Sequence, residues 1–306
     1  MSEQISSKQN TARLQIILAM AAFGTIGAFV KNIQLPAAEI ALYRAVIASV
    51  CLFLFMLAGG KLSALPSAKG MLWMLFLSGA AMGFNWILLF EAYRHTSVAL
   101  STLSYYFAPT VVIIASAALF REKLTAKQTV CFLASTAGLV LVIGVSGGGG
   151  DMTGVLCGLG AALLYAAVVL MNKAAVGVGG VIRTWVQFTS AAVILLPYVF
   201  FTCGFHIAEL NSAGLFSLLI VGTVHTGIIY CLYFASLAYL KGQQAAILSY
   251  IDPVVAVLVS VLWLGESITR MQLAGGGMIL FFAAINELRF DRAQAIWKPG
   301  AKKEER

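Results

Sequence analysis

Residues 106–128 read YFAPTVVIIASAALFREKLTAKQ, and residues 250–272 read YIDPVVAVLVSVLWLGESITRMQ. Five identities recur at a constant offset of 144 residues, and in each copy a mainly apolar run separates the proline from the glutamate. Self-similarity at a fixed spacing indicates an internal duplication of the chain. The paired residues are Tyr106 and Tyr250, Pro109 and Pro253, Glu122 and Glu266, Thr125 and Thr269, and Gln128 and Gln272.

The composition indicates a membrane protein, since the 306-residue chain is 60% hydrophobic and only 10% charged. A soluble domain carries roughly a quarter charged residues. The apolar runs have about 20 residues, enough for a helix to cross about 30 Å of hydrocarbon. We therefore predict an all-α integral membrane protein with ten transmembrane helices. The expected spans are residues 13–31, 38–58, 70–93, 97–120, 125–146, 153–175, 181–203, 212–239, 242–264 and 268–289.

The positions of the basic residues predict the orientation. With the N-terminus inside the cell, 16 of the 20 Lys and Arg residues fall on the cytoplasmic side, three fall outside, and Arg44 lies within a span. This asymmetry is typical of a multi-pass protein of the cell inner membrane with both termini cytoplasmic. It also explains the net charge of +8 without nucleic acid, so the expected partner is the lipid bilayer.

The number of spans in each copy predicts how the copies relate. Five spans is an odd number, so the second copy must cross the membrane upside down relative to the first. Inverted repeats are typical of secondary transporters, in which a central site opens to each face in turn. The expected divisions are a cytoplasmic tail at 1–12, a first repeat at 13–146, an outer linker at 147–152, a second repeat at 153–289 and a basic cytoplasmic tail at 290–306.

With this organisation the sequence resembles the drug/metabolite transporter superfamily, and within it the EamA-type exporters of metabolites and amino acids. The resemblance covers about residues 13 to 289. It implies secondary transport, commonly efflux of amino acids or related metabolites, with the site between the two halves. It is carried by the repeated proline and glutamate, by Ala92-Tyr93 and Ala238-Tyr239 before each fourth span, and by Arg44 early in the second span.

The repeated glutamates and prolines have structural interpretations. Glu122 and Glu266 each precede a Thr-x-x-Gln capping box, which satisfies free backbone N–H groups where the fifth span of each half begins. We interpret both as braces of that turn, with gating as the alternative. Pro109 and Pro253 each remove a backbone hydrogen bond within a span. A kink beside a cavity and simple helix packing are both compatible with this pattern.

Asp252 is the acid expected nearest the middle of the membrane, where a carboxylate costs about 2.5–3.5 kcal/mol on insertion scales. The first copy has Ala108 at this place, so the repeat does not require a carboxyl group. Asp252 is expected to hold a proton for coupling or to bind a substrate amine; the alternative is bonding to backbone groups that Pro253 frees. His225 lies mid-span and either forms a proton-linked pair with Asp252 or has only a structural role.

A polar cluster is expected near the outer ends of the second and third spans. Arg44 follows Glu39 by five residues, which is about 7.5 Å along a helix. A buried arginine needs a counter-ion, and Glu91 is the expected partner. The group Glu39, Arg44 and Glu91 is interpreted as a gate that breaks during transport, or as a permanent strut.

Aromatic residues gather in the spans expected to line a cavity. Tyrosines at this depth need partners for their hydroxyl groups, so each either faces a wet cavity or packs between helices. The cluster contains Trp86, Tyr105, Tyr106, Tyr165, Tyr230, Tyr233 and Tyr250. The residues expected to contact substrate are Asn85, Trp86, Tyr105, Tyr106, Tyr165, His225, Tyr230, Tyr250 and Asp252.

These patterns favour a transporter of small, partly apolar metabolites, with protons as the candidate coupling partner. Phosphorylated substrates are disfavoured, since their sites recruit several basic side chains. Arg44 is the one basic residue that we expect within a span. The sequence contains no His-Glu-x-x-His, Gly-x-Ser-x-Gly or Walker pattern, and its five cysteines lack paired spacing. We therefore expect no enzyme, metal or cofactor. A passive facilitator of the same fold is the alternative, and monomer and homodimer are both compatible with the sequence.

Overall fold

The computed structural model describes residues 2–120, 124–144, 149–175, 178–237, 240 and 248–287, and this part of the chain is helical without strands. Seven helical segments within it are long and apolar enough to cross a membrane, and Ala126–Val142 and Ile251–Trp263 are shorter apolar helices. The prediction of an all-α, multi-pass membrane protein is therefore confirmed. The number of ten spans and the inversion of the second half stay predictions.

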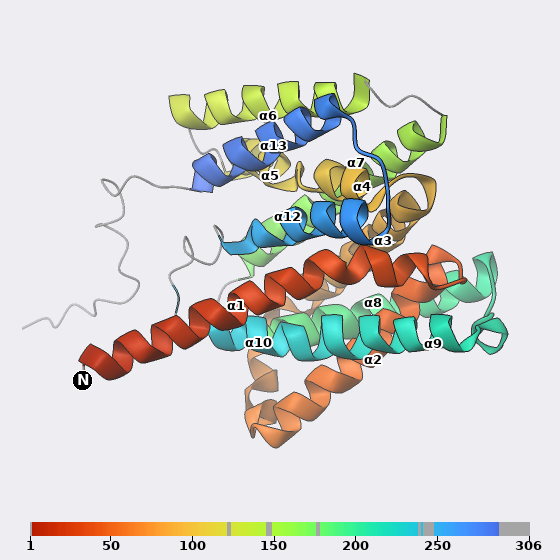
Figure 1. Cartoon of the computed structure of the whole chain (residues 1–306). Coiled ribbons are helices and arrows are strands. Elements are labelled where there is room, and N and C mark those ends of the chain that lie inside the picture. Colours follow the sequence, from red (N-terminus) through yellow and green to blue (C-terminus); the bar gives the residue numbers. More distant parts are fainter. Residues whose placement is uncertain are drawn as a thin grey trace, which may run out of the picture.

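The first half of the chain forms helices that follow the expected spans (Figure 1). The fourth of these spans is interrupted at residues 106–107, and α5 begins at Ala108, one residue before Pro109. The helices are α1 (Ser2–Lys31), α2 (Ala37–Ala58), the 3-10 helix η1 (Lys61–Met71), α3 (Leu72–His95), α4 (Val98–Tyr105), α5 (Ala108–Phe120) and α6 (Ala126–Gly144).

In the second half, the continuous helix over residues 212–237 changes from α-helical to π-helical winding and back. Its middle segment is π-helical, with bonds to the fifth residue back, and such segments are frequent at functional sites. A second π-helical segment ends the helix that begins near Asp252. The elements are α7 (Gly149–Ala174), α8 (Gly180–Thr202), η2 (Ile207–Glu209), α9 (Ser212–Leu219), π-helical η3 (Ile220–Ile228), α10 (Ile229–Leu237), α12 (Ile251–Leu258), π-helical η4 (Val259–Trp263) and α13 (Arg270–Glu287).

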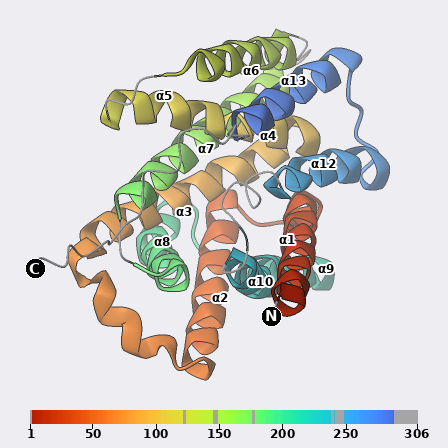
Figure 2. The same ribbon diagram turned by 90° about the vertical axis from the view of Figure 1, so that its left-hand side faces the viewer.

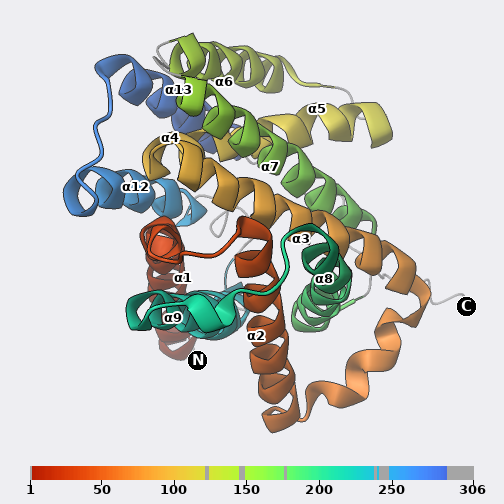
Figure 3. The same ribbon diagram turned by 90° about the vertical axis from the view of Figure 1, so that its right-hand side faces the viewer.

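Helices of the two halves pack against each other rather than forming separate bodies. The main contacts across the halves join α3 with α7 and α8, α6 with α13, α2 with α8 and η3, and α1 with α12. The ribbon shows α6 and α13 side by side at one edge and α1, α2, α8 and α10 at the other, with α3, α4, α7 and α12 between them (Figures 2 and 3). Any site in this central layer is therefore built from both halves.

Glycines permit the closest of these contacts. A Cβ atom at Gly138 would lie 2.6 Å from the carbonyl oxygen of Gly275, and one at Gly275 would lie 2.5 Å from that of Gly138. On the other side of the molecule, a Cβ at Gly24 would lie 2.6 Å from the carbonyl oxygen of Asp252. Small residues let helices in a membrane pack with their backbones close together, here α6 on α13 and α1 on α12.

The two predicted capping boxes are present. The Thr269 backbone N–H donates to Gln272 Oε1 at 2.9 Å, and the Gln272 N–H donates to Thr269 Oγ1 at 3.1 Å. The same reciprocal bonds join Thr125 and Gln128, at 2.8 and 3.2 Å. Each pair satisfies backbone donors that a helix start leaves free, so α6 and α13 begin in the same way. Glu122 lies outside the described residues.

Candidate functional site

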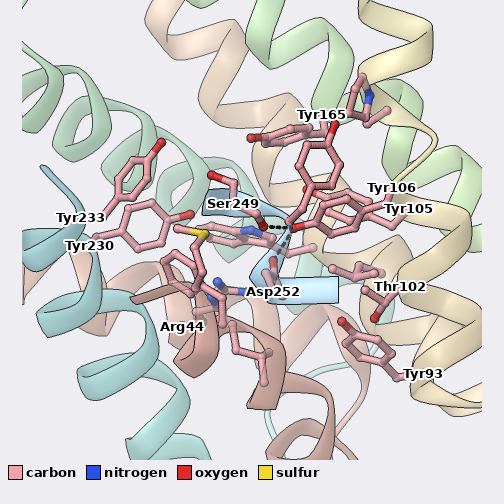
Figure 4. A pocket seen from close by; sticks show the side chains of 18 residues that line it. Arg44, Tyr93, Thr102, Tyr105, Tyr106, Tyr165, Tyr230, Tyr233, Ser249 and Asp252 are labelled. Carbon is pink, nitrogen blue, oxygen red and sulfur yellow. Dashed lines mark hydrogen bonds between the residues drawn. The ribbon is translucent and has the colours of Figure 1, made fainter. Parts of the chain in front are cut away.

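A cavity of about 320 Å³ lies where the two copies of the repeated motif meet. This volume falls in the range of small-molecule sites, roughly 300–1,000 Å³. The lining residues come from α1, α2, α3, α4, α5, α7, α10 and α12, and from the residues just before α12. The lining within the described part of the chain has two charged side chains, Arg44 and Asp252, and seven tyrosines (Figure 4).

The second half also has a helix break, at Tyr250 directly before α12, and it faces the break at residues 106–107 across this cavity. Residues 105–109 of the first half and residues 249–252 of the second half line it, and the rings of Tyr106 and Tyr250 lie 6.2 Å apart. Proline is tolerated in the first turn of a helix because no intrahelical donor is lost there, and Pro109 and Pro253 take such positions in α5 and α12. Pro109 lines the cavity, and Pro253 is buried and is not among the lining residues.

Asp252 is held at the cavity wall by the first half of the chain. The Tyr106 hydroxyl donates to Asp252 Oδ2 at 2.7 Å and lies 3.4 Å from the carbonyl oxygen of Ser249 (Figure 4). Asp252 is also in the first turn of α12, where the helix dipole favours negative charge. The carboxyl group therefore has one strong donor from the opposite repeat and remains on the cavity wall.

Arg44 is the cation of the cavity, and its side chain is only 4% exposed. Its Nε donates to Thr226 Oγ1 at 2.8 Å, and its guanidinium lies 4.5 Å from the centroid of the Trp86 ring and 5.6 Å from that of Phe90. Stacking of a guanidinium on aromatic faces is favourable. Within the described part of the chain, Arg44 makes no ion pair and its terminal nitrogens have no hydrogen-bond partner.

The predicted ion pair between Arg44 and Glu91 is wrong. Glu91 lies near the end of α3 and pairs there with Arg94 at 3.3 Å and with His95 at 3.6 Å. Glu39 is fully buried, and it accepts hydrogen bonds from the His206 backbone N–H at 2.7 Å and ring Nδ1 at 3.2 Å. The reason lies in α3: Trp86 and Phe90 lie against Arg44, whereas the neighbouring Glu91 is partly exposed. The three residues therefore do not form one cluster.

Of the two interpretations of His225, the structure favours the structural role over a proton-linked pair with Asp252. His225 Nε2 lies 2.8 Å from Thr25 Oγ1, and its Nδ1 lies 3.2 Å from the carbonyl oxygen of Ile220. The side chain is buried and lies outside the cavity lining. His225 therefore contacts α1. His225 thus links two helices.

Of the nine residues expected to contact substrate, the structure brings seven to the cavity. The two exceptions are His225 and Asn85. Asn85 is buried, and its Nδ2 donates to the carbonyl oxygen of Ala161 at 2.5 Å. This bond connects α3 to α7 behind the cavity wall. The residues at the wall are Trp86, Tyr105, Tyr106, Tyr165, Tyr230, Tyr250 and Asp252.

Three polar lining residues, Tyr93, Thr102 and Ser249, were not predicted. Helical spacing is the signal that could have found two of them. Tyr93 follows Trp86 by seven residues, and Thr102 precedes Tyr106 by four, so each shares a helix face with an expected residue. No comparable signal identifies Ser249, which lies outside the regular part of α12.

Glu266 connects the two halves at the end of the molecule where α1 ends and α4 begins. Its Oε2 accepts from the Val98 backbone N–H at 2.8 Å and from Ser260 Oγ at 2.5 Å, and its Oε1 pairs with Lys31. The carboxylate thus satisfies a free donor at the start of α4. It was predicted to brace the turn before α13, and its bonds with Ser260 do span that turn; its side chain also binds α1 and α4 of the other half.

Comparison with known proteins adds family information to this geometry. Residues 10–144 and 152–286 each match the model of the EamA-like transporter family. The chain is 29% identical over 290 residues to the uncharacterized transporter YxxF of Bacillus subtilis, covering 93% of this chain and 92% of the relative. It is 27% identical over 222 residues to the protein PecM of Dickeya dadantii, covering 71% and 73%. A protein of known crystal structure shares the fold, with a TM-score of 0.62 and 18% identity over 90% of this chain and 96% of the other.

Proposed function

The chain belongs to the EamA-like transporter family and is a membrane transporter, and from this premise we propose that it is a secondary transporter for small, partly apolar metabolites. Amino acids or related compounds are the proposed substrates, and efflux across the cytoplasmic membrane is the proposed direction. The proposed mechanism is alternating access between two inverted repeats, residues 13–146 and 153–289.

The observation that carries this proposal is the position of the cavity. It lies between the interrupted helices of the two halves and is lined by residues of both copies of the motif. In transporters built from inverted repeats, sites lie at the repeat interface and are formed by interrupted helices. A change in the packing of one half against the other would then alter which end of the cavity is open.

The chemistry of the lining supports an amino-acid-like substrate. Arg44 offers a cation, and the tyrosines offer apolar faces with hydroxyl groups. Asp252 offers either a site for a proton or a partner for a substrate amine. A molecule with a carboxylate, an amine and an apolar body would find a partner for each part. Sites for polyanionic substrates would gather several basic groups, whereas Arg44 is the basic lining residue of the described cavity.

Asp252 is the proposed coupling group. Burial in the membrane disfavours the ionised form of a carboxyl group, while the hydrogen bond from Tyr106 favours it. A carboxyl group in such a balance can bind a proton when the cavity faces one side and release it on the other. Import of protons would then drive export of substrate.

The experiment is transport by the full chain in liposomes, with radiolabelled amino acids and a pH difference across the membrane. We expect accumulation against the substrate gradient when the pH difference is present and only exchange when an ionophore removes it. Equal transport in both conditions would favour the passive facilitator. No movement of any tested compound above that of empty liposomes would contradict the proposal.

A further inference from the structure

We propose that Arg44 forms a carboxylate-binding subsite in the cavity and that Thr226 is the positioning residue that holds its guanidinium in place. This inference rests on the proposed transport function, because it assigns one chemical group of the transported molecule to one side chain. The ligand class is a small carboxylic acid whose apolar body lies against the tyrosines.

The unsatisfied donors of Arg44 are the first observation. The side chain is 4% exposed and lines the cavity. One face of its guanidinium stacks on Trp86, and Nε is bonded to Thr226. Its terminal nitrogens have no partner among the described residues, and Asp252, the other charged lining residue, is bonded to Tyr106. A buried charge with free donors is costly, and a carboxylate matches the planar fork of a guanidinium with two parallel hydrogen bonds.

The second observation is that the Thr226 hydroxyl group takes part in two hydrogen bonds. Oγ1 accepts from Arg44 Nε and donates to the carbonyl oxygen of Val221, five residues earlier, at 2.7 Å. This spacing is that of the π-helical η3. The side chain is fully buried, so Thr226 Oγ1 has one orientation that satisfies both bonds.

Close packing of η3 on α2 explains why this orientation is held. A Cβ atom at Gly222 would lie 2.7 Å from Ile47, and one at Gly227 would lie 2.7 Å from Cys51. The two glycines flank Thr226 in sequence and bring its backbone against the helix that carries Arg44. Because Nε is bonded to Thr226 and the guanidinium stacks on Trp86, the remaining donors of Arg44 are directed to the cavity that it lines (Figure 4).

The test compares acids with their uncharged amides. The full chain in lipid nanodiscs is titrated with L-phenylalanine, L-leucine and 3-phenylpropionate, and with the primary amide of each, while its melting temperature is measured. We expect at least one acid to stabilise the protein and its amide to bind far more weakly. The affinity for that acid should fall about 100-fold in Arg44→Gln, since two charge-assisted hydrogen bonds are lost.

The Thr226 variants separate positioning from folding. Thr226→Val should weaken binding of the acid about tenfold, and Thr226→Ser, which keeps the hydroxyl group, should restore it. Thr223→Val is the matched control, because Thr223 lies on the same segment and donates to the Leu219 carbonyl oxygen at 2.6 Å. It should bind the acid like the parent. If Arg44→Gln does not fold, the Thr226 and Thr223 variants decide the question.

The proposal is overturned if the amides bind as well as the acids, if none of the acids stabilises the parent protein, or if Thr226→Val binds the acid like the parent. Transport in liposomes distinguishes this failure from that of the proposed function. Amides carried equally by the parent and by Arg44→Gln would overturn the subsite and leave transport intact. Acids that bind through Arg44 without being transported would support the subsite and overturn the transport function.

Discussion

The two copies of the repeated motif share their construction and differ in their chemistry. Both interrupt a helix before a proline, and both start the following helix with a Thr-x-x-Gln capping box. At the place where the first copy has Ala108, the second has Asp252, and the first copy supplies Tyr106 as its hydrogen-bond donor. Both copies thus contribute to the wall of the cavity, and its one carboxyl group among the described lining residues lies where the copies have diverged.

The first way to break this comparison is to test whether the copies are inverted. A reporter fused after Arg306 should be cytoplasmic, and one inserted between Gly147 and Asp151 should be external, because each half has an odd number of expected spans. The effect is all or none, and accessibility of the reporter in intact cells measures it. Both reporters on the same side would refute the inverted repeat.

The second prediction concerns the carboxyl group that distinguishes the copies. Asp252→Asn keeps the shape of the side chain but cannot release a proton. We expect liposomes with this variant to exchange substrate while losing nearly all accumulation driven by a pH difference. Accumulation like that of the parent would show that Asp252 is not the coupling group. Complete loss of binding would instead indicate that the carboxylate contacts the substrate.

Much of the scaffold was predictable from the sequence, because its causes are local. Apolar runs predict helices, Thr-x-x-Gln predicts the starts of α6 and α13, and all seven residues of the aromatic cluster line the cavity. The orientation of single polar residues was not predictable. The contacts of His225 and Arg44 involve the π-helical segment η3 and its packing against α2. Neither composition nor residue spacing predicts these two features. Glu266 likewise binds Val98, a residue distant in the chain.

The third prediction tests the packing that places Asp252. A Cβ atom at Gly24 would lie 2.6 Å from the Asp252 carbonyl oxygen and 2.7 Å from Val255 Cβ, so Gly24→Ala must push α12 away. We expect a loss of about 1–3 kcal/mol in stability, measured as a lower melting temperature in detergent. Gly277→Ala is the control, because its Cβ would have no neighbour within 4 Å. Equal melting temperatures of the two variants would contradict close packing of α1 on α12.

The smallest predicted effect belongs to the hydrogen bond that joins the copies. Tyr106→Phe removes the donor to Asp252 Oδ2 but keeps the ring, so the cavity wall should stay in place. A hydrogen bond of this kind contributes about 1 kcal/mol net, and we expect pH-driven transport to slow about fivefold. Tyr250→Phe, the equivalent change in the second copy, leaves the Tyr106–Asp252 bond intact and should slow transport less. If the two variants are equally slow, the Tyr106–Asp252 hydrogen bond has no separate effect on transport. Both tyrosines would then act through their hydroxyl groups in the cavity wall, and Asp252 would be the one tested difference between the copies.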